Sequence, residues 1–98
     1  MSLTDKQKRD KQIALRVMWR DFPERSIVDF CADLNLQVKC LNSRNRHYRI
    51  SGVRDVELYA TTGTVNATPH NGKGAINVKN MEPERALKRA TTIAIHGY

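Results

Sequence analysis

The chain has 98 residues, of which 17 are Lys or Arg and 10 are Asp or Glu, so its net charge is +7. Hydrophobic residues make up 40% of the chain, which suffices for a folded domain and exceeds a disordered composition. A domain of this size buries about two-thirds of its unfolded surface and has room for one core, which excludes a large enzyme. No apolar run approaches the roughly 18–20 residues of a membrane span, and the first residues contain no apolar secretory segment. We therefore expect one soluble, intracellular, basic domain over residues 1–98.

The first predicted element is a helix over residues 5–20. Thr4 and Gln7 have the spacing of a capping box at its start. Its apolar face follows helical spacing and comprises Leu15, Met18, Trp19 and Phe22. A basic stripe lies roughly opposite that face and comprises Lys6, Arg9, Arg16 and Arg20. Such an apolar face serves either the chain's own core or a partner, and the pattern does not decide between them.

A second helix is predicted from Pro23, which suits the first turn of a helix, to a C-cap at Asn35. Its apolar face has the same spacing and comprises Ile27, Phe30, Cys31 and Leu34. Beyond Asn35 the period changes from 3.6 to 2, so strands follow.

Four or five short strands are predicted over residues 36–40, 47–50, 56–60, 65–67 and 75–78. Apolar side chains alternate with polar ones along them. The connections are short, and Asn71-Gly72 is the strongest two-residue hairpin signal in the chain. Because parallel strands need long crossovers, we predict an antiparallel meander.

The last predicted element is a helix over residues 84–95, which Pro83 opens and Gly97 ends. Its apolar face comprises Ala86, Leu87, Ala90, Ile93 and Ala94. A twisted sheet with helices on one face buries the apolar faces of both the helices and the strands. The predicted fold is therefore α+β, with two N-terminal helices, an antiparallel four- or five-stranded meander and a C-terminal helix packed on one sheet face.

The two cysteines, Cys31 and Cys40, are predicted to be reduced and buried, because each falls on an apolar face. The histidines lie far apart in the sequence, and none has metal-ligand spacing to a cysteine; they are His47, His70 and His96. We therefore expect no metal and no cofactor.

The positive charge is concentrated in the first helix and in residues 36–54, which contain five basic residues and no acid. Strand alternation places Lys39, His47 and Arg49 on the sheet face away from the core, with Tyr59 beside them. Cations around an exposed ring are able to hold phosphates while the ring stacks on a base. The alternative is a solvated face whose charge serves solubility.

The candidate site for a nucleic acid or another anionic partner follows from this distribution. Its first part lies in the hairpin region and comprises Lys39, Arg44, Arg46, His47, Arg49, Arg54 and Tyr59. Its second part lies on the first helix and comprises Arg9, Arg16 and Arg20. The segment Asn71-Gly72-Lys73-Gly74 is similar to a phosphate-binding loop, but it lacks the first Gly and the Ser/Thr of a Walker A motif. We predict a hairpin turn there.

His47, beside Arg46 and Arg49, is the one residue that suggests catalysis. As a general base for phosphodiester cleavage it would have cations nearby to stabilise the developing charge. Such chemistry needs a second group, and Asp55 or Glu57 lies near His47 only if the neighbouring strands pair in a particular register. The alternative is an exposed strand histidine without a chemical role.

The strand Arg46-His47-Tyr48-Arg49-Ile50 and the segment Val56–Val65, with its Thr61-Thr62-Gly63, resemble a pattern in small uncharacterised bacteriophage accessory proteins. There an aromatic-basic strand precedes a strand ending in Thr-Thr-Gly, a Gly-rich loop and a short helix. Those proteins often have Pro where this chain has Ala60. The resemblance implies a phage origin, and such proteins commonly bind and block host machinery, including restriction and CRISPR effector complexes.

The order helix, three strands, helix also resembles the double-stranded-RNA-binding fold and the HicA-type toxin ribonucleases built on it. That resemblance implies that His47 corresponds to the toxin's strand histidine. The chain departs from the pattern at two motifs, and its first helix and extra strands have no counterpart in the pattern. The toxin's Gly-Ser is Asn45-Arg46 here, and the lysine cluster that opens the last helix is replaced by Glu82-Pro83-Glu84-Arg85.

The sequence therefore predicts a non-enzymatic binding protein that occupies a nucleic acid or the nucleic-acid channel of a host nucleoprotein complex. The resemblance to phage proteins makes its concrete form an anti-CRISPR or anti-restriction inhibitor in the cytoplasm of the bacterial host cell. We expect no membrane and no small-molecule substrate. Two alternatives stay open: an RNA-cleaving toxin with His47 as base, and a regulatory phage protein that binds a host protein through an apolar patch including Trp19.

Overall fold

The computed structural model describes residues 5–98 and contains three helices and five strands in the predicted order. They are α1 (Asp5–Arg20), α2 (Glu24–Ala32), β1 (Gln37–Asn42), β2 (His47–Ser51), β3 (Val56–Tyr59), β4 (Thr64–Ala67), β5 (Ile76–Val78) and α3 (Pro83–His96). Each strand pairs antiparallel with the next, so the sheet order is β1-β2-β3-β4-β5. The predicted α+β meander is confirmed, and it has five strands.

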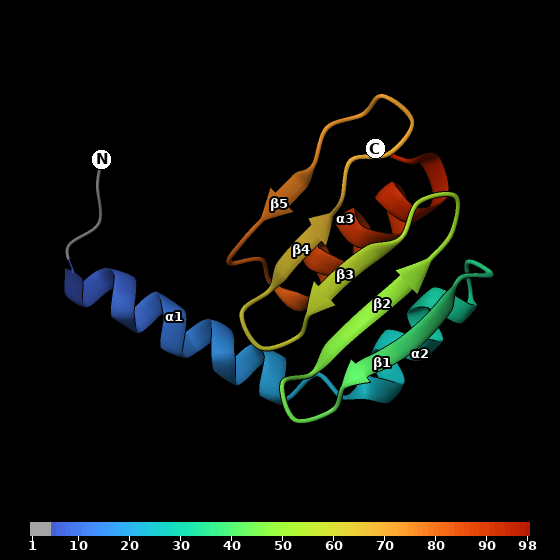
Figure 1. Cartoon of the computed structure of the whole chain (residues 1–98). Helices are drawn as coiled ribbons and strands as arrows, with labels where there is room; N and C mark the ends of the chain where they lie inside the picture. Colours follow the sequence, from blue (N-terminus) through green and yellow to red (C-terminus); the bar gives the residue numbers. More distant parts are fainter. Residues whose placement is uncertain (1–4) are drawn as a thin grey trace.

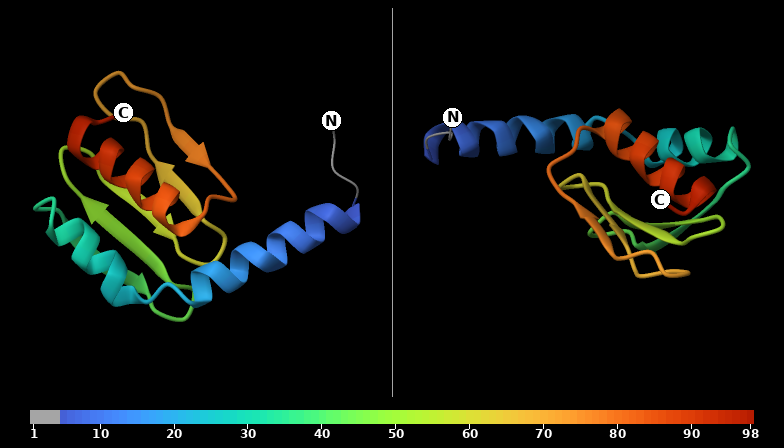
Figure 2. Two further views of the ribbon diagram at one scale, coloured as in Figure 1. Left: turned by 180° about the vertical axis from the view of Figure 1, so that it is seen from behind. Right: turned by 90° about the horizontal axis from the view of Figure 1, so that it is seen from above.

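The helices lie on one side of the sheet. Helices α2 and α3 cover one sheet face, while the opposite face carries no helix (Figure 2). Helix α1 extends away from this body (Figure 1). Among residues 5–98, no helix has the length and apolar character needed to cross a bilayer. The open sheet face and the projecting α1 are therefore both accessible.

The core lies between the sheet and the two covering helices. Strand register places Ile50 opposite Val56, and Leu58 opposite both Tyr48 and Val65, on the covered face. The predicted face of α3 is fully buried and comprises Ala86, Leu87, Ala90, Ile93 and Ala94. Three of these residues are alanines, and their small side chains let α3 lie close to the sheet.

Helix α1 is fastened to the body at its C-terminal end by Trp19. The Trp19 indole is fully buried, and its Nε1 donates to the carbonyl of Met81 at 2.9 Å. The Met81 N–H in turn donates to the carbonyl of Gly63 at 3.1 Å. Arg46 donates from Nη1 to the carbonyl of Trp19 at 2.5 Å and from Nη2 to that of Phe22 at 2.6 Å. The indole thus joins α1 to the segment before α3, which the Met81 N–H joins to the β3–β4 turn, and the guanidinium joins the end of α1 to the turn that precedes β2.

Two predicted turns adopt the left-handed backbone that their residues favour. Asn71 and Gly72 have φ of 47° and 78°, and His70 and Lys73 exchange backbone hydrogen bonds across them. This is a two-residue hairpin turn, as predicted for the Asn71–Gly74 segment. Gly97 ends α3 with φ of 84°.

The two cysteines differ in burial. Cys31 is buried as predicted, and burial raises the pKa of its thiol to about 11, which keeps it neutral. The prediction that Cys40 is buried is wrong. Cys40 lies opposite Tyr48 but on the edge strand β1, beside a register shift between Cys40 and Asn42, and it is exposed.

Two other expectations about the helices need correction. Met18 and Leu34, predicted on apolar faces, are exposed: on α1 only Leu15 and Trp19 are buried, and Leu34 lies beyond the end of α2. Helix α2 ends at Ala32, and Asn35 takes up a left-handed φ of 59° in the turn that follows. The predicted capping box involves Thr4, which lies outside the described residues.

Replacing Gly63 by Ala is predicted to destabilise the fold strongly. Gly63 has φ of +70°, and an added Cβ would lie 2.0 Å from the Met81 carbonyl oxygen, a backbone atom. We expect Gly63→Ala to lower the free energy of unfolding in urea by about 3 kcal/mol or more. The control is Gly72→Ala, where φ is +78° but nothing lies within 4 Å of the added Cβ, so about 1–2 kcal/mol is expected. Equal losses would contradict the tight packing of the β3–β4 turn against Met81.

Candidate functional site

The open sheet face carries a continuous polar surface. Strand register aligns one row of side chains across all five strands, consisting of Lys39, Arg49, Glu57, Asn66 and Asn77. A neighbouring row consists of His47, Tyr59 and Thr64. The predicted placement of Lys39, His47, Arg49 and Tyr59 on the face away from the core is confirmed.

His47, Glu57 and Arg49 form a compact cluster on this face. The His47 ring stacks on Tyr59, with 4.1 Å between ring centroids and 12° between the ring planes. Glu57 Oε1 lies 3.2 Å from His47 Nε2 and 3.7 Å from Arg49 Nη2. The catalytic hypothesis required a strand register that brings Glu57 close to His47, and the structure has this register. Because Glu57 partly neutralises Arg49, the open face is less basic than its sequence suggests.

Two arginines of the predicted site act inside the fold instead. Arg54, expected in an exposed loop, is only 2% exposed. Its guanidinium donates to the carbonyl of Thr68 at 3.1 and 2.5 Å, of Gly97 at 2.8 Å and of Gly74 at 2.7 Å. Arg46 is half-buried and fastens α1 as described above. Including Arg54 among the partner contacts was wrong, because its donors are already used by backbone carbonyls.

Most of the exposed positive charge therefore lies on α1. The helix carries six basic and two acidic side chains, a net charge of +4. All six cations are exposed; they are Lys6, Lys8, Arg9, Lys11, Arg16 and Arg20. Among residues 5–20, only Leu15 and Trp19 are buried, so the first ten residues of α1 project with every side chain in solvent.

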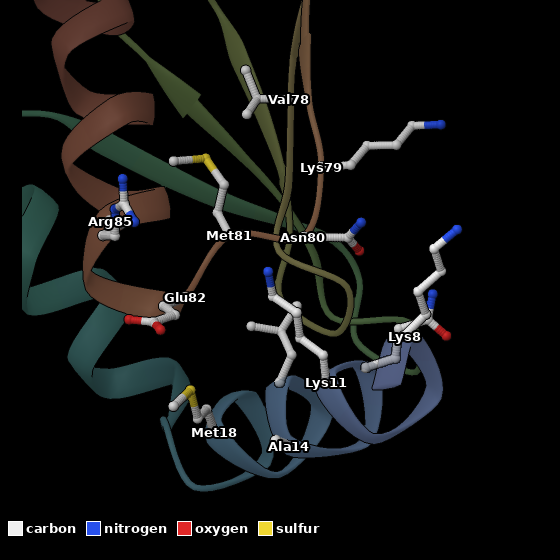
Figure 3. A pocket seen from close by; sticks show the side chains of 12 residues that line it. Lys8, Lys11, Ala14, Met18, Val78, Lys79, Asn80, Met81, Glu82 and Arg85 are labelled. Carbon is white, nitrogen blue, oxygen red and sulfur yellow. The ribbon is translucent and has the colours of Figure 1, made fainter. Parts of the chain in front are cut away.

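Two hollows flank α1. The first, of about 590 Å³, lies between α1 and the segment that joins β5 to α3 (Figure 3). It brings Lys8 and Lys11 of α1 opposite Lys79 and Arg85. The second hollow is more open than the first. It brings together three predicted site residues, Arg16 and Arg20 of α1 and Arg46 of the β1–β2 turn. The predicted hairpin and helix patches thus meet at the C-terminal end of α1.

The sequence interpretation missed Lys8 and Lys11. Both precede Leu15 by helical intervals of seven and four residues, so they share its side of the helix. Cations at those positions are inconsistent with a helix face packed on a core. The sequence thus already indicated that this side of α1 is exposed at its N-terminal end. The regulatory alternative placed Trp19 in an apolar patch that binds a host protein. Trp19 is fully buried, so its side chain is not accessible to such a partner.

Comparison of the chain with protein-family models, with curated proteins and with solved structures found no match. The function is therefore argued from the side chains themselves.

The internal role of Arg54 predicts a large difference between two arginine substitutions. Arg54→Ala removes a buried guanidinium and its hydrogen bonds to the carbonyls of Thr68, Gly74 and Gly97, of which the bond to Gly97 is buried, and we expect it to lower the free energy of unfolding by about 3 kcal/mol or more. Arg44→Ala, in the exposed β1–β2 turn, is the control and should change it by less than about 0.5 kcal/mol. Chemical denaturation of both variants measures the difference. A loss at Arg54 as small as at Arg44 would refute the internal role.

Proposed function

We propose that this chain is a non-enzymatic binding protein whose projecting helix α1 occupies a nucleic acid or the nucleic-acid channel of a host nucleoprotein complex. The observation that carries the proposal is the combination of net charge and exposure on α1. A helix with a charge of +4 and ten successive exposed residues leaves most of its positive charge unpaired: among residues 5–98, Arg20 alone of its six cations has an ion-pair contact, with the exposed Asp21 at 3.7 Å. A negatively charged polymer is the complementary partner.

The dimensions of α1 suit this role. Its 16 residues span about 24 Å at 1.5 Å per residue. The major groove of B-DNA, about 12 Å wide, admits an α-helix, and phosphates line both of its edges. Arg9, Arg16 and Arg20 on the outer side of α1 would contact these phosphates. Arg44, Lys39 and Arg49 would extend the contact to the hairpin, while Arg46 positions α1 rather than binding the partner.

The class of host complex follows from the resemblance to phage accessory proteins. We propose a counter-defence role, as an anti-CRISPR or anti-restriction inhibitor in the bacterial cytoplasm. Inhibition would be steric and electrostatic, because α1 would lie where a guide or target backbone otherwise binds.

The first experiment is a salt series of binding to labelled single- and double-stranded RNA and DNA. We expect log K to fall with log salt at a slope of about −4 on duplex DNA, since about four or five phosphates would be neutralised. Arg9→Glu/Arg16→Glu should weaken binding about tenfold or more and make the slope shallower. The control Arg25→Glu/Arg89→Glu changes net charge equally on α2 and α3 and should change affinity far less.

Two results would contradict the proposal. One is an equal loss with the control variant, which would show that net charge alone acts. The other is no binding to any of the four nucleic acids together with no inhibition of CRISPR or restriction cleavage.

A second candidate function, RNA cleavage, is favoured by the contact between His47 and Glu57. With the imidazole proton on Nε2, 3.2 Å from Glu57 Oε1, the Nδ1 lone pair of His47 would take the proton of a 2′-hydroxyl. The 2′-oxygen would attack phosphorus, forming a cyclic phosphate, and the 5′-oxygen would leave with a proton from water. Glu57 would stabilise the imidazolium, and Arg49 would pair with the phosphate.

Incubation of labelled RNA with the wild type, His47→Ala and Glu57→Gln separates the two functions. The binding proposal predicts intact RNA in all three cases. Cleavage by the wild type that falls by about 100-fold or more in His47→Ala, with folding unchanged, would establish the ribonuclease instead.

A further inference from the structure

The groove between α1 and the β5–α3 segment combines an apolar floor with basic rims. Leu15 and Met18 of α1 and Val78 and Met81 of the facing segment contribute apolar side chains (Figure 3). Met18 is 45% exposed although it lies next to the buried Trp19. Met18 thus adds exposed apolar surface to a groove whose rims are basic.

The four cations of this groove have no partner within residues 5–98. Lys8, Lys11, Lys79 and Arg85 form no ion pair and no side-chain hydrogen bond in that part of the chain. Glu82 is the one acidic residue that lines the groove. The groove thus has an excess of three positive charges, arranged on both rims of an apolar strip.

This combination distinguishes between two kinds of anionic partner. Phosphates satisfy the cations, but a phosphate backbone gives an apolar floor nothing to bury. An amphipathic helix with acidic flanks satisfies both, because apolar residues spaced by three, four and seven positions lie in the floor while its carboxylates meet the rims. A second copy of this chain is disfavoured, since its net charge is +7 and α1 itself is +4.

We propose that the groove between α1 and the β5–α3 segment binds an acidic amphipathic helix of a protein partner. It lies on the inner side of α1, whereas Arg9 and Arg16 lie on the outer side, so it does not depend on nucleic-acid binding there. A partner helix of three to four turns would lie along α1. Its apolar side chains would cover Met18 and Met81, and its carboxylates would pair with Lys8 and Lys11 on one rim and Lys79 and Arg85 on the other.

The test uses a synthetic 16-residue helical peptide with Leu at four helically spaced positions and Glu on both flanks. Fluorescence anisotropy measures its affinity, and NMR follows the methyl groups of Met18 and Met81. We expect shifts of both methyls on binding. Lys11→Glu/Lys79→Glu and Met18→Ser should each weaken binding about tenfold or more. Met18→Ser changes an exposed side chain, so the variant should fold normally.

Matched controls keep the result specific. Arg25→Glu/Lys39→Glu changes net charge equally, at exposed positions of α2 and β1 that do not line the groove, and should retain the affinity for the peptide, as should Arg9→Glu/Arg16→Glu. The second control separates this site from the proposed nucleic-acid surface, because it should lose nucleic-acid binding while it retains the peptide.

Three outcomes would overturn the proposal. Equal affinity for a peptide with Ser in place of Leu would show that only charge acts. Perturbation of Met18 and Met81 by duplex DNA but not by the peptide would assign the groove to nucleic acid. A dimer in light scattering that dissociates in Met18→Ser would show that a second copy fills the groove.

Discussion

The attachment of α1 through Trp19 determines which surfaces this protein presents. A buried indole donates to the Met81 carbonyl, and the Arg46 guanidinium donates to the carbonyls of Trp19, in the last turn of α1, and of Phe22, just beyond it. Because the helix is fixed at this end alone, its first ten residues extend into solvent. Helices of this length are marginal in water by themselves. Anchoring at Trp19 therefore sets the direction of α1, and a partner would supply the remaining stabilisation along its length.

The sequence was sufficient to predict the elements and the layer arrangement. The bounds of α1, the meander and the buried face of α3 follow from periods of 3.6 and 2, which local residues determine. Turns at Asn71-Gly72 and Gly97 follow from the left-handed backbone that these residues accept. The sequence was not sufficient for Arg46 and Arg54. Their acceptors lie more than ten positions away in the chain, so only the tertiary structure reveals that these charges are used internally.

The internal hydrogen bonds of Arg46 and Arg54 change where the accessible positive charge of the molecule lies. The segment 36–54 contains five basic residues, but Arg46 and Arg54 bind carbonyls and Arg49 faces Glu57. The excess that remains accessible lies mainly on α1, where Arg20 alone has an ion-pair partner, Asp21, among residues 5–98. The strand register places Glu57 beside Arg49, which lowers the affinity of the open face for phosphates. The same register brings Glu57 to His47. The open face is thus better suited to chemistry or limited recognition than to long contact with a nucleic-acid backbone.

Amide hydrogen exchange tests the central claim, that α1 is the nucleic-acid-binding element, most directly. In the free protein, the amides of the first ten residues of α1 should exchange fast, while those of β2, β3 and α3 are protected. Duplex DNA or RNA should slow exchange along α1 and leave α3 unchanged. Slowed exchange at the open face of β2 and β3, with α1 still exchanging as in the free protein, would contradict the account.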